Sequence, residues 1–188
     1  MNLPIVVLVT GHPGSGKTTL AKALAQALQL PLTGKDQIQE TLLDTLGWST
    51  EEWARKLSVA SWALLYQQVE RLVCSGIDQI VESTFDPRYA NAQWASLTQK
   101  YSFRLIQIRC EARVDVLITR YQERIANGTR HPGHIDRSAD VAFLDTIRQG
   151  LMAWIDIEST RLSVNTAVHS KENYATIATS IKQVMANT

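Results

Sequence analysis

Short apolar segments alternate along the chain with longer segments that have the periodicity of helices. Residues 5–10 form a continuous, mostly β-branched run, which is typical of a strand buried on both faces. In the Ala-rich segment 17–28, Leu20, Leu24 and Leu28 recur at every fourth position, and this spacing predicts a helix with one apolar face. Alternation of these two patterns is typical of a parallel sheet covered by helices.

The same alternation continues along the chain. Further strands are predicted at residues 30–33, 77–81, 103–110 and 162–168. Helices are predicted from about 36 to 47, from 49 to 74 and from 174 to 185. Ser49 is the predicted N-cap of the middle helix, with Glu52 three residues later. The pattern predicts an α/β fold, a three-layer, doubly wound, five-stranded parallel sheet, in one domain over residues 1–188.

Composition and charge add few constraints. Of the 188 residues, 45% are apolar and 20% charged, which is typical of a globular domain with a sizeable core. The net charge of +1 gives no reason to expect a nucleic acid or an anionic membrane as partner. The N-terminal apolar run is too short to span a bilayer, and Cys74 and Cys110 are predicted to be two buried thiols. We therefore expect a cytoplasmic protein.

The segment between the first predicted strand and helix matches the phosphate-binding motif G-x-x-x-x-G-K-[ST] at every position. Its glycines let backbone N–H groups converge on a polyphosphate, and the helix N-terminus that follows favours anions. Lys17 is predicted to reach the β- and γ-phosphates of ATP as a catalytic residue, and Thr18 to bind Mg²⁺. The predicted nucleotide-binding residues are Gly11, His12, Pro13, Gly14, Ser15, Gly16, Lys17, Thr18 and Thr19, together with Arg130 from a later loop.

Two carboxylates follow other predicted strands. Asp36 comes after the second strand, where it would face the γ-phosphate and accept a proton from an incoming hydroxyl, or would instead cap the next helix. Glu82 ends the third strand and is predicted to hold Mg²⁺ with Thr18, the alternative being a solvated strand end.

Arginines gather after the fourth predicted strand. Arg113, Arg120 and Arg124 are spaced by seven and four, which places them on one stripe of a helix, and Arg130 follows in a loop. Arg120 and Arg124 are predicted to act catalytically by stabilising the transferring phosphoryl group from a mobile lid. The alternative is an exposed stripe that pairs with neighbouring carboxylates. His131 and His134 lie in the same loop, and no role is assigned to them.

Aromatic residues gather between the second and third predicted strands, in the segment that follows Asp36. They are Trp48, Trp53, Trp62 and Tyr66. They would stack on an aromatic acceptor or, as large aromatic side chains more often do, fasten the helix to the sheet. The segment from 37 to 99 has eight acidic residues and four basic ones, which disfavours a polynucleotide acceptor.

The loop at residues 11–18, the Lys35-Asp36 pair and the later arginines resemble P-loop kinases of the nucleoside-monophosphate-kinase-like fold. The resemblance is nearest to the branch that contains polynucleotide 5′-hydroxyl kinase, chloramphenicol phosphotransferase and zeta-type toxins. It implies that Asp36 is the acceptor-activating base and that Arg120, Arg124 and Arg130 contact the phosphoryl group. It also implies a lid at about 112–140 and acceptor-side helices at about 36–75. Glu82 departs from the Asp that relatives more often carry.

The predicted function is ATP- and Mg²⁺-dependent transfer of a γ-phosphate to a hydroxyl of a small-molecule acceptor. A regulatory NTPase acting through a protein partner would also need the phosphate-binding loop, Mg²⁺ and an arginine. It would not need an acceptor base after the second strand, so Asp36 distinguishes the two hypotheses.

Overall fold

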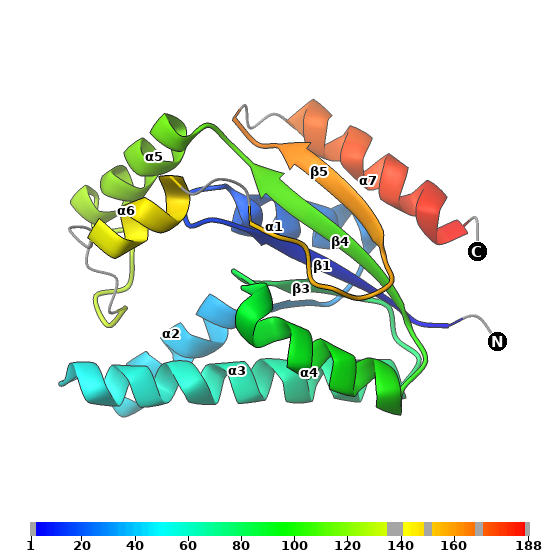
Figure 1. Cartoon of the computed structure of the whole chain (residues 1–188), viewed down its shortest axis with the longest axis horizontal. Coiled ribbons are helices and arrows are strands. Elements are labelled where there is room, and N and C mark those ends of the chain that lie inside the picture. The colour runs from blue at the N-terminus through cyan, green and yellow to red at the C-terminus, as the bar shows by residue number, and fades with distance from the viewer. Residues whose placement is uncertain (1–2, 135–140, 149–151, 168–170, 187–188) are drawn as a thin grey trace.

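A computed structural model describes residues 3–134, 141–148, 152–167 and 171–186. Its centre is a five-stranded parallel sheet with the strand order β2-β3-β1-β4-β5 (Figure 1). The strands are β1 (Ile5–Gly11), β2 (Leu32–Gly34), β3 (Gln79–Glu82), β4 (Arg104–Glu111) and β5 (Thr160–Asn165). The described helices are α1 (Lys17–Leu28), α2 (Lys35–Leu46), α3 (Glu51–Cys74), α4 (Pro87–Lys100), α5 (Val114–Ala126), α6 (Val141–Arg148) and α7 (Lys171–Ala186).

Helices cover both faces of the sheet, as the apolar run of β1 predicts. Val7 and Val9 of β1 belong to the cluster of apolar side chains that α1 and α7 join, whereas Val6 and Leu8 belong to the cluster formed with α3 and α4. Because side chains alternate across a strand, a central strand with apolar residues at every position serves both clusters. The predicted three-layer, doubly wound α/β fold is confirmed.

The parallel arrangement brings the carboxyl ends of the strands to one edge. Gly34 at the end of β2 pairs with Glu82 of β3, and Val9 near the end of β1 also pairs with Glu82. Helices α5 and α6 lie together beyond this edge (Figure 1). The loop after β1 therefore lies beside the start of α2 and the end of β3, which is the arrangement that the sequence predicts for a nucleotide site.

Three sequence predictions need correction. The N-cap of α3 is Thr50, whose side chain accepts a hydrogen bond from the backbone N–H of Trp53, and Ser49 lies one residue outside. Cys74 is exposed because it is the last residue of α3, while Cys110 is buried in β4; both are free thiols. The last strand begins at Thr160, two residues before the predicted start, because its edge position leaves its polar residues partly exposed and weakens the apolar pattern. The strand ends at Asn165, so its predicted continuation through residues 166 and 167 is wrong, and residue 168 lies outside the described residues.

Within the described ranges, the helices are too short or too polar to cross a membrane.

Candidate active site

The loop between β1 and α1 has the backbone that its glycines permit. Gly14 and Gly16 adopt φ angles of 80° and 79°, which side-chain-bearing residues rarely adopt. A Cβ on Gly14 would lie 2.7 Å from the carbonyl oxygen of Leu117, and one on Gly11 would lie 2.7 Å from that of Cys110. The glycines at these positions are therefore required by φ and by close packing, and the loop ends at the N-terminus of α1.

Hydrogen bonds from two other segments hold this loop. The backbone N–H of Ser15 donates to the carbonyl of His12 across the turn at 3.0 Å. The Thr84 hydroxyl, after β3, donates to the Gly11 carbonyl at 3.2 Å, and the Thr166 hydroxyl, after β5, donates to the Ser15 carbonyl. Sequence reasoning missed Thr166 because its contact with the loop spans 151 residues of chain.

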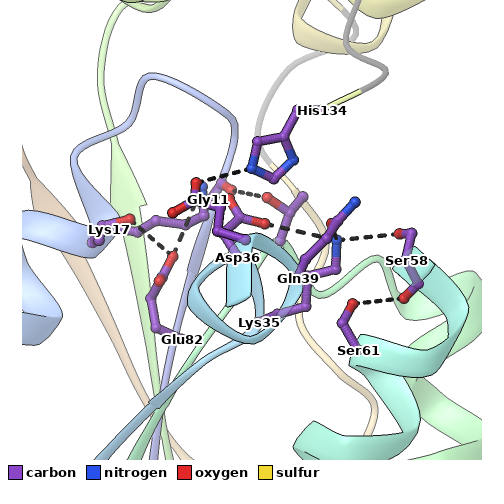
Figure 2. A network of polar contacts seen from close by, with 12 residues as sticks. Gly11, Lys17, Lys35, Asp36, Gln39, Ser58, Ser61, Glu82 and His134 are labelled. Atoms are coloured by element: carbon purple, nitrogen blue, oxygen red, sulfur yellow. Dashed lines mark hydrogen bonds and ion pairs between the residues drawn. The ribbon is translucent and has the colours of Figure 1, made fainter. Parts of the chain in front are cut away.

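Lys17 and Glu82 come together beside the loop (Figure 2), and Thr18 contacts the same carboxylate. The Thr18 hydroxyl donates to the Glu82 carboxylate at 3.3 Å, and the Lys17 ammonium lies 4.0 Å from the same carboxylate. Burial raises the pKa of Glu82, and the positive charge of Lys17 only partly opposes this effect. A hydroxyl and a carboxylate oxygen side by side are ligands that suit Mg²⁺, which prefers oxygen donors and retains several waters. Thr19, also predicted to bind nucleotide, is exposed in the first turn of α1.

Asp36 lies in the first turn of α2 and not at its cap. The helix begins at Lys35 and its N-cap is Gly34, so the alternative in which Asp36 caps the helix is wrong. Burial alone would raise the pKa of Asp36, but the positive charges of Lys17 and Lys35 outweigh it and hold the pKa below its ordinary value. The Asp36 side chain is thus a carboxylate at neutral pH.

Asp36 and Lys17 line one cavity of about 490 Å³. Arg124 and Arg130 line it from the α5 side, and Pro13 of the phosphate-binding loop also borders it. The nucleotide loop, the candidate base and two of the predicted arginines therefore share a single space.

The structure places the other two arginines of the predicted stripe outside the cavity lining. The Arg120 guanidinium donates to the carbonyls of Thr166 and Ala167 at 3.1 and 2.8 Å. Arg113 is the N-cap residue of α5, and its exposed side chain forms an ion pair with Asp115 at 3.0 Å. The prediction that Arg113, Arg120 and Arg124 lie on one stripe of a helix is therefore wrong, because Arg113 precedes α5.

A cluster of polar side chains on α2 and α3, formed by Lys35, Gln39 and Ser58, was not predicted from the sequence (Figure 2). The buried Lys35 donates to Gln39, one turn further along α2, and to Ser58 of α3 at 3.2 Å. Gln39, Ser58 and Arg55 line the same cavity. The available signal was the position of Lys35, adjacent to Asp36 and directly after β2.

The loop after α5 is fastened to α2 by its two histidines. His134 pairs with Glu40 and His131 with Asp44, each at 2.9 Å, and these carboxylates lie one helical turn apart. Burial lowers the pKa of His134 despite its carboxylate partner. The remainder of the predicted lid, residues 135–140, lies outside the described residues.

The four candidate aromatic residues have different positions. Trp62 lines the cavity and stacks on Tyr66 with 6.0 Å between ring centroids, while both pack against the apolar cluster under α3. The Trp53 indole donates to the Gly47 carbonyl at 3.1 Å, and Trp48 contacts the lid loop edge-on at His131. One of the four, Trp62, is therefore placed to contact a molecule in the cavity.

The sequence and structure are similar to those of known proteins. Residues 6–149 match a protein family described as an AAA domain. A candidate kinase from Chloroflexus aurantiacus J-10-fl, solved by crystallography, is 36% identical, and the match covers 97% of this chain and 98% of that one with a TM-score of 0.88. A gluconokinase from Sinorhizobium meliloti 1021 is 18% identical, covers 100% of this chain and 96% of that one, and has a TM-score of 0.61, which shows a shared fold.

Curated relatives are more distant in sequence. An uncharacterised protein from Mycobacterium tuberculosis (strain ATCC 25618 / H37Rv) is 27% identical over 77% of this chain, and the chain spans 29% of that protein's length. A shikimate kinase from Rhodopirellula baltica is 26% identical over 72% of this chain and 68% of that protein.

Proposed function

The chain belongs to the AAA domain family, and from this premise we propose that it is an ATP-dependent kinase that transfers the γ-phosphate to a hydroxyl of a small-molecule acceptor. The observation that carries the proposal is the shared cavity, in which Lys17 of the phosphate-binding loop faces Asp36 of α2. Similarity to the Chloroflexus candidate kinase and to the Rhodopirellula shikimate kinase supports the same reaction class.

Each residue of the site has a part in this reaction. The N–H groups of the loop and the Lys17 ammonium bind the polyphosphate. Asp36 accepts the proton of the acceptor hydroxyl while the oxygen of that hydroxyl approaches the γ-phosphorus. Arg124 and Arg130 offset negative charge on the equatorial oxygens. Thr18 and Glu82 would hold Mg²⁺, which supplies charge neutralisation at the β- and γ-phosphate oxygens.

Asp36 is suited to its part because it stays ionised. The positive charges of Lys17 and Lys35 lower its pKa, so the carboxylate is available as a proton acceptor at any pH near neutrality. A regulatory NTPase would leave this carboxylate and the adjoining cavity without a role.

The proposal is tested by transfer of labelled γ-phosphate from ATP and Mg²⁺ to pooled nucleosides, sugars, hydroxy acids and hydroxyl-bearing antibiotics. We expect transfer to one pool by the wild type and none by Lys17→Ala. Asp36→Asn should bind ATP with nearly unchanged affinity and transfer phosphate roughly 10²–10⁴-fold more slowly, because it has lost only the base. Release of free phosphate at a rate that no pool and no Asp36 variant changes would contradict the proposal and favour a regulatory NTPase.

A further inference from the structure

The cavity has more positive charge than a nucleotide accounts for. Five cationic side chains line it, whereas Asp36 is the single carboxylate among the described residues of its lining. The cations are Lys17, Lys35, Arg55, Arg124 and Arg130. In the proposed reaction, Lys17, Arg124 and Arg130 contact the polyphosphate, so Lys35 and Arg55 remain on the opposite wall, which α2 and α3 form.

Lys35 is the buried cation of this wall. It is buried, and it donates hydrogen bonds to two uncharged side chains, Gln39 and Ser58. The nearest carboxylate oxygen, on Asp36, is 3.7 Å away, and that side chain is half-exposed. One half-exposed carboxylate at 3.7 Å offsets only part of the cost of burying an ammonium, and burial accordingly lowers the pKa of Lys35 more than Asp36 raises it. An anion in the cavity would supply the missing counter-charge.

Arg55 extends this positive wall along α3. It lies one turn before Ser58, with which it lines the cavity, and its ion pair with Glu51 is long, at 3.9 Å, and open to solvent on both sides. Exposed pairs of this kind contribute little, so the guanidinium is readily available to a ligand. Arginine forks also match carboxylate and phosphate oxygens in geometry.

We propose that the acceptor of the phosphoryl group is itself a small anion, a hydroxyl compound bearing a carboxylate or a phosphate monoester, and that Lys35 and Arg55 bind this anionic group. The inference rests on the proposed kinase function, because it takes the other three cations to be occupied by nucleotide. It places the acceptor with its anionic end on the α2–α3 wall and a hydroxyl at Asp36. A neutral acceptor would leave Asp36, which also interacts with Lys17, as the anionic partner of Lys35 among the described residues.

Anion binding is tested separately from catalysis. The protein is saturated with Mg²⁺ and the non-hydrolysable ATP analogue AMP-PNP, and inorganic phosphate and acetate are then titrated by calorimetry as probes of the two anionic groups. We expect at least one of them to bind, and its Kd to rise roughly tenfold or more in Lys35→Met and in Arg55→Met. The matched control is Lys56→Met, which removes an exposed cation paired with Glu52 on the same helix and should leave the Kd unchanged.

The two probes distinguish a phosphate-bearing acceptor from a carboxylate-bearing one. Failure of both to bind, or a Kd that Arg55→Met or a folded Lys35→Met leaves unchanged, would overturn the inference. Transfer assays distinguish this failure from failure of the proposed function. Phosphorylation of glycerol or glucose at the rate of glycerate, gluconate or the corresponding sugar phosphates would retain the kinase and reject the anionic acceptor. Cation-dependent anion binding without transfer to any pool would retain the anion-binding site and reject the proposed kinase function.

Discussion

Glu82 combines burial with a negative charge, and its neighbours do not fully compensate for it. The residue is 4% exposed, the Thr18 hydroxyl donates one hydrogen bond to it, and Lys17 lies at 4.0 Å. Its pKa is raised because desolvation exceeds these attractions. The protein without metal therefore loses free energy of unfolding when this side chain ionises, and a divalent cation at the carboxylate would restore it.

We predict that Glu82→Gln stabilises the metal-free protein at neutral pH. The folded protein binds the Glu82 proton more tightly than the unfolded chain does. Protonated Glu82 therefore adds its full share to the free energy of unfolding below pH 4.5, and this share is lost as pH rises through the higher pKa of the folded state. The difference in melting temperature between variant and wild type should accordingly grow from pH 5 to pH 8.

The same variant should respond poorly to ligand. Addition of Mg²⁺ and ATP should raise the melting temperature of the wild type clearly more than that of Glu82→Gln, because the variant lacks an anionic ligand for the metal. Equal thermal shifts in the two proteins would remove Glu82 from the metal site.

At the scale of elements, the contact between α2 and the lid loop joins the candidate base to the lid arginines. Asp36, Glu40 and Asp44 are spaced by four along α2, so they lie on one face of this helix. Glu40 and Asp44 bind the two histidines of the loop, and Asp36 faces the cavity. Helix α2 thus positions the base and docks the loop that carries Arg130.

Gly133 of this loop packs closely against Leu43 of α2 and against Trp48. A Cβ at this position would lie 2.9 Å from a ring carbon of Trp48 and 3.0 Å from a methyl group of Leu43. We predict that Gly133→Ala destabilises the docked loop by about 1–3 kcal/mol, the usual cost of overpacking. Hydrogen exchange should show faster exchange at residues 131–134, and the KM for ATP should rise as Arg130 is displaced.

A double-mutant cycle with Trp48→Ala provides the control for this prediction. Removal of the indole opens space for the new methyl group, so Gly133→Ala should cost less in the Trp48→Ala background than in the wild type. Strictly additive effects would show that the alanine acts through the backbone and not through the contact with Trp48.

At the scale of the whole molecule, the segment after β5 links the phosphate-binding loop to α5. Thr166 donates to the Ser15 carbonyl of the loop, and its own carbonyl accepts from Arg120 of α5. Arg120 and Arg124 are one helical turn apart, yet the first binds this segment and the second lines the cavity.

We predict opposite effects of substitution at these two arginines. Arg120→Met should lower the free energy of unfolding by about 1–3 kcal/mol, because the partly buried hydrogen bonds to the Thr166 and Ala167 carbonyls lose their charged donor, while kcat changes little. Arg124→Met should keep the stability and lower kcat roughly 10²-fold, since it removes charge stabilisation from the transferring group. Denaturant unfolding and steady-state kinetics on both variants check this prediction, and a loss of kcat confined to Arg120→Met would reverse the assignment.

The sequence by itself determined the features that depend on neighbouring residues. Continuous apolar runs such as β1, the four-residue spacing of leucines in α1 and the glycine-rich motif between them predict local conformation directly, since strand burial, helix periodicity and permissive φ angles are short-range properties. The order of chain segments then restricts a parallel sheet to few topologies. The fold, the position of Lys17 and Thr18 beside the strand edge, and the approach of Glu82 to them were therefore predictable.

The tertiary structure alone decided which polar groups meet across the chain. Arg120 and Arg124 have the same local pattern, and only their tertiary contacts, with the segment after β5 and with the cavity respectively, separate them. In the sequence, Lys35 has no feature that distinguishes it from a surface lysine. In the structure, α3 covers it and Ser58 lies 3.2 Å from its ammonium. Contacts of this kind depend on how two elements pack, and each element carries no local signal of its partner.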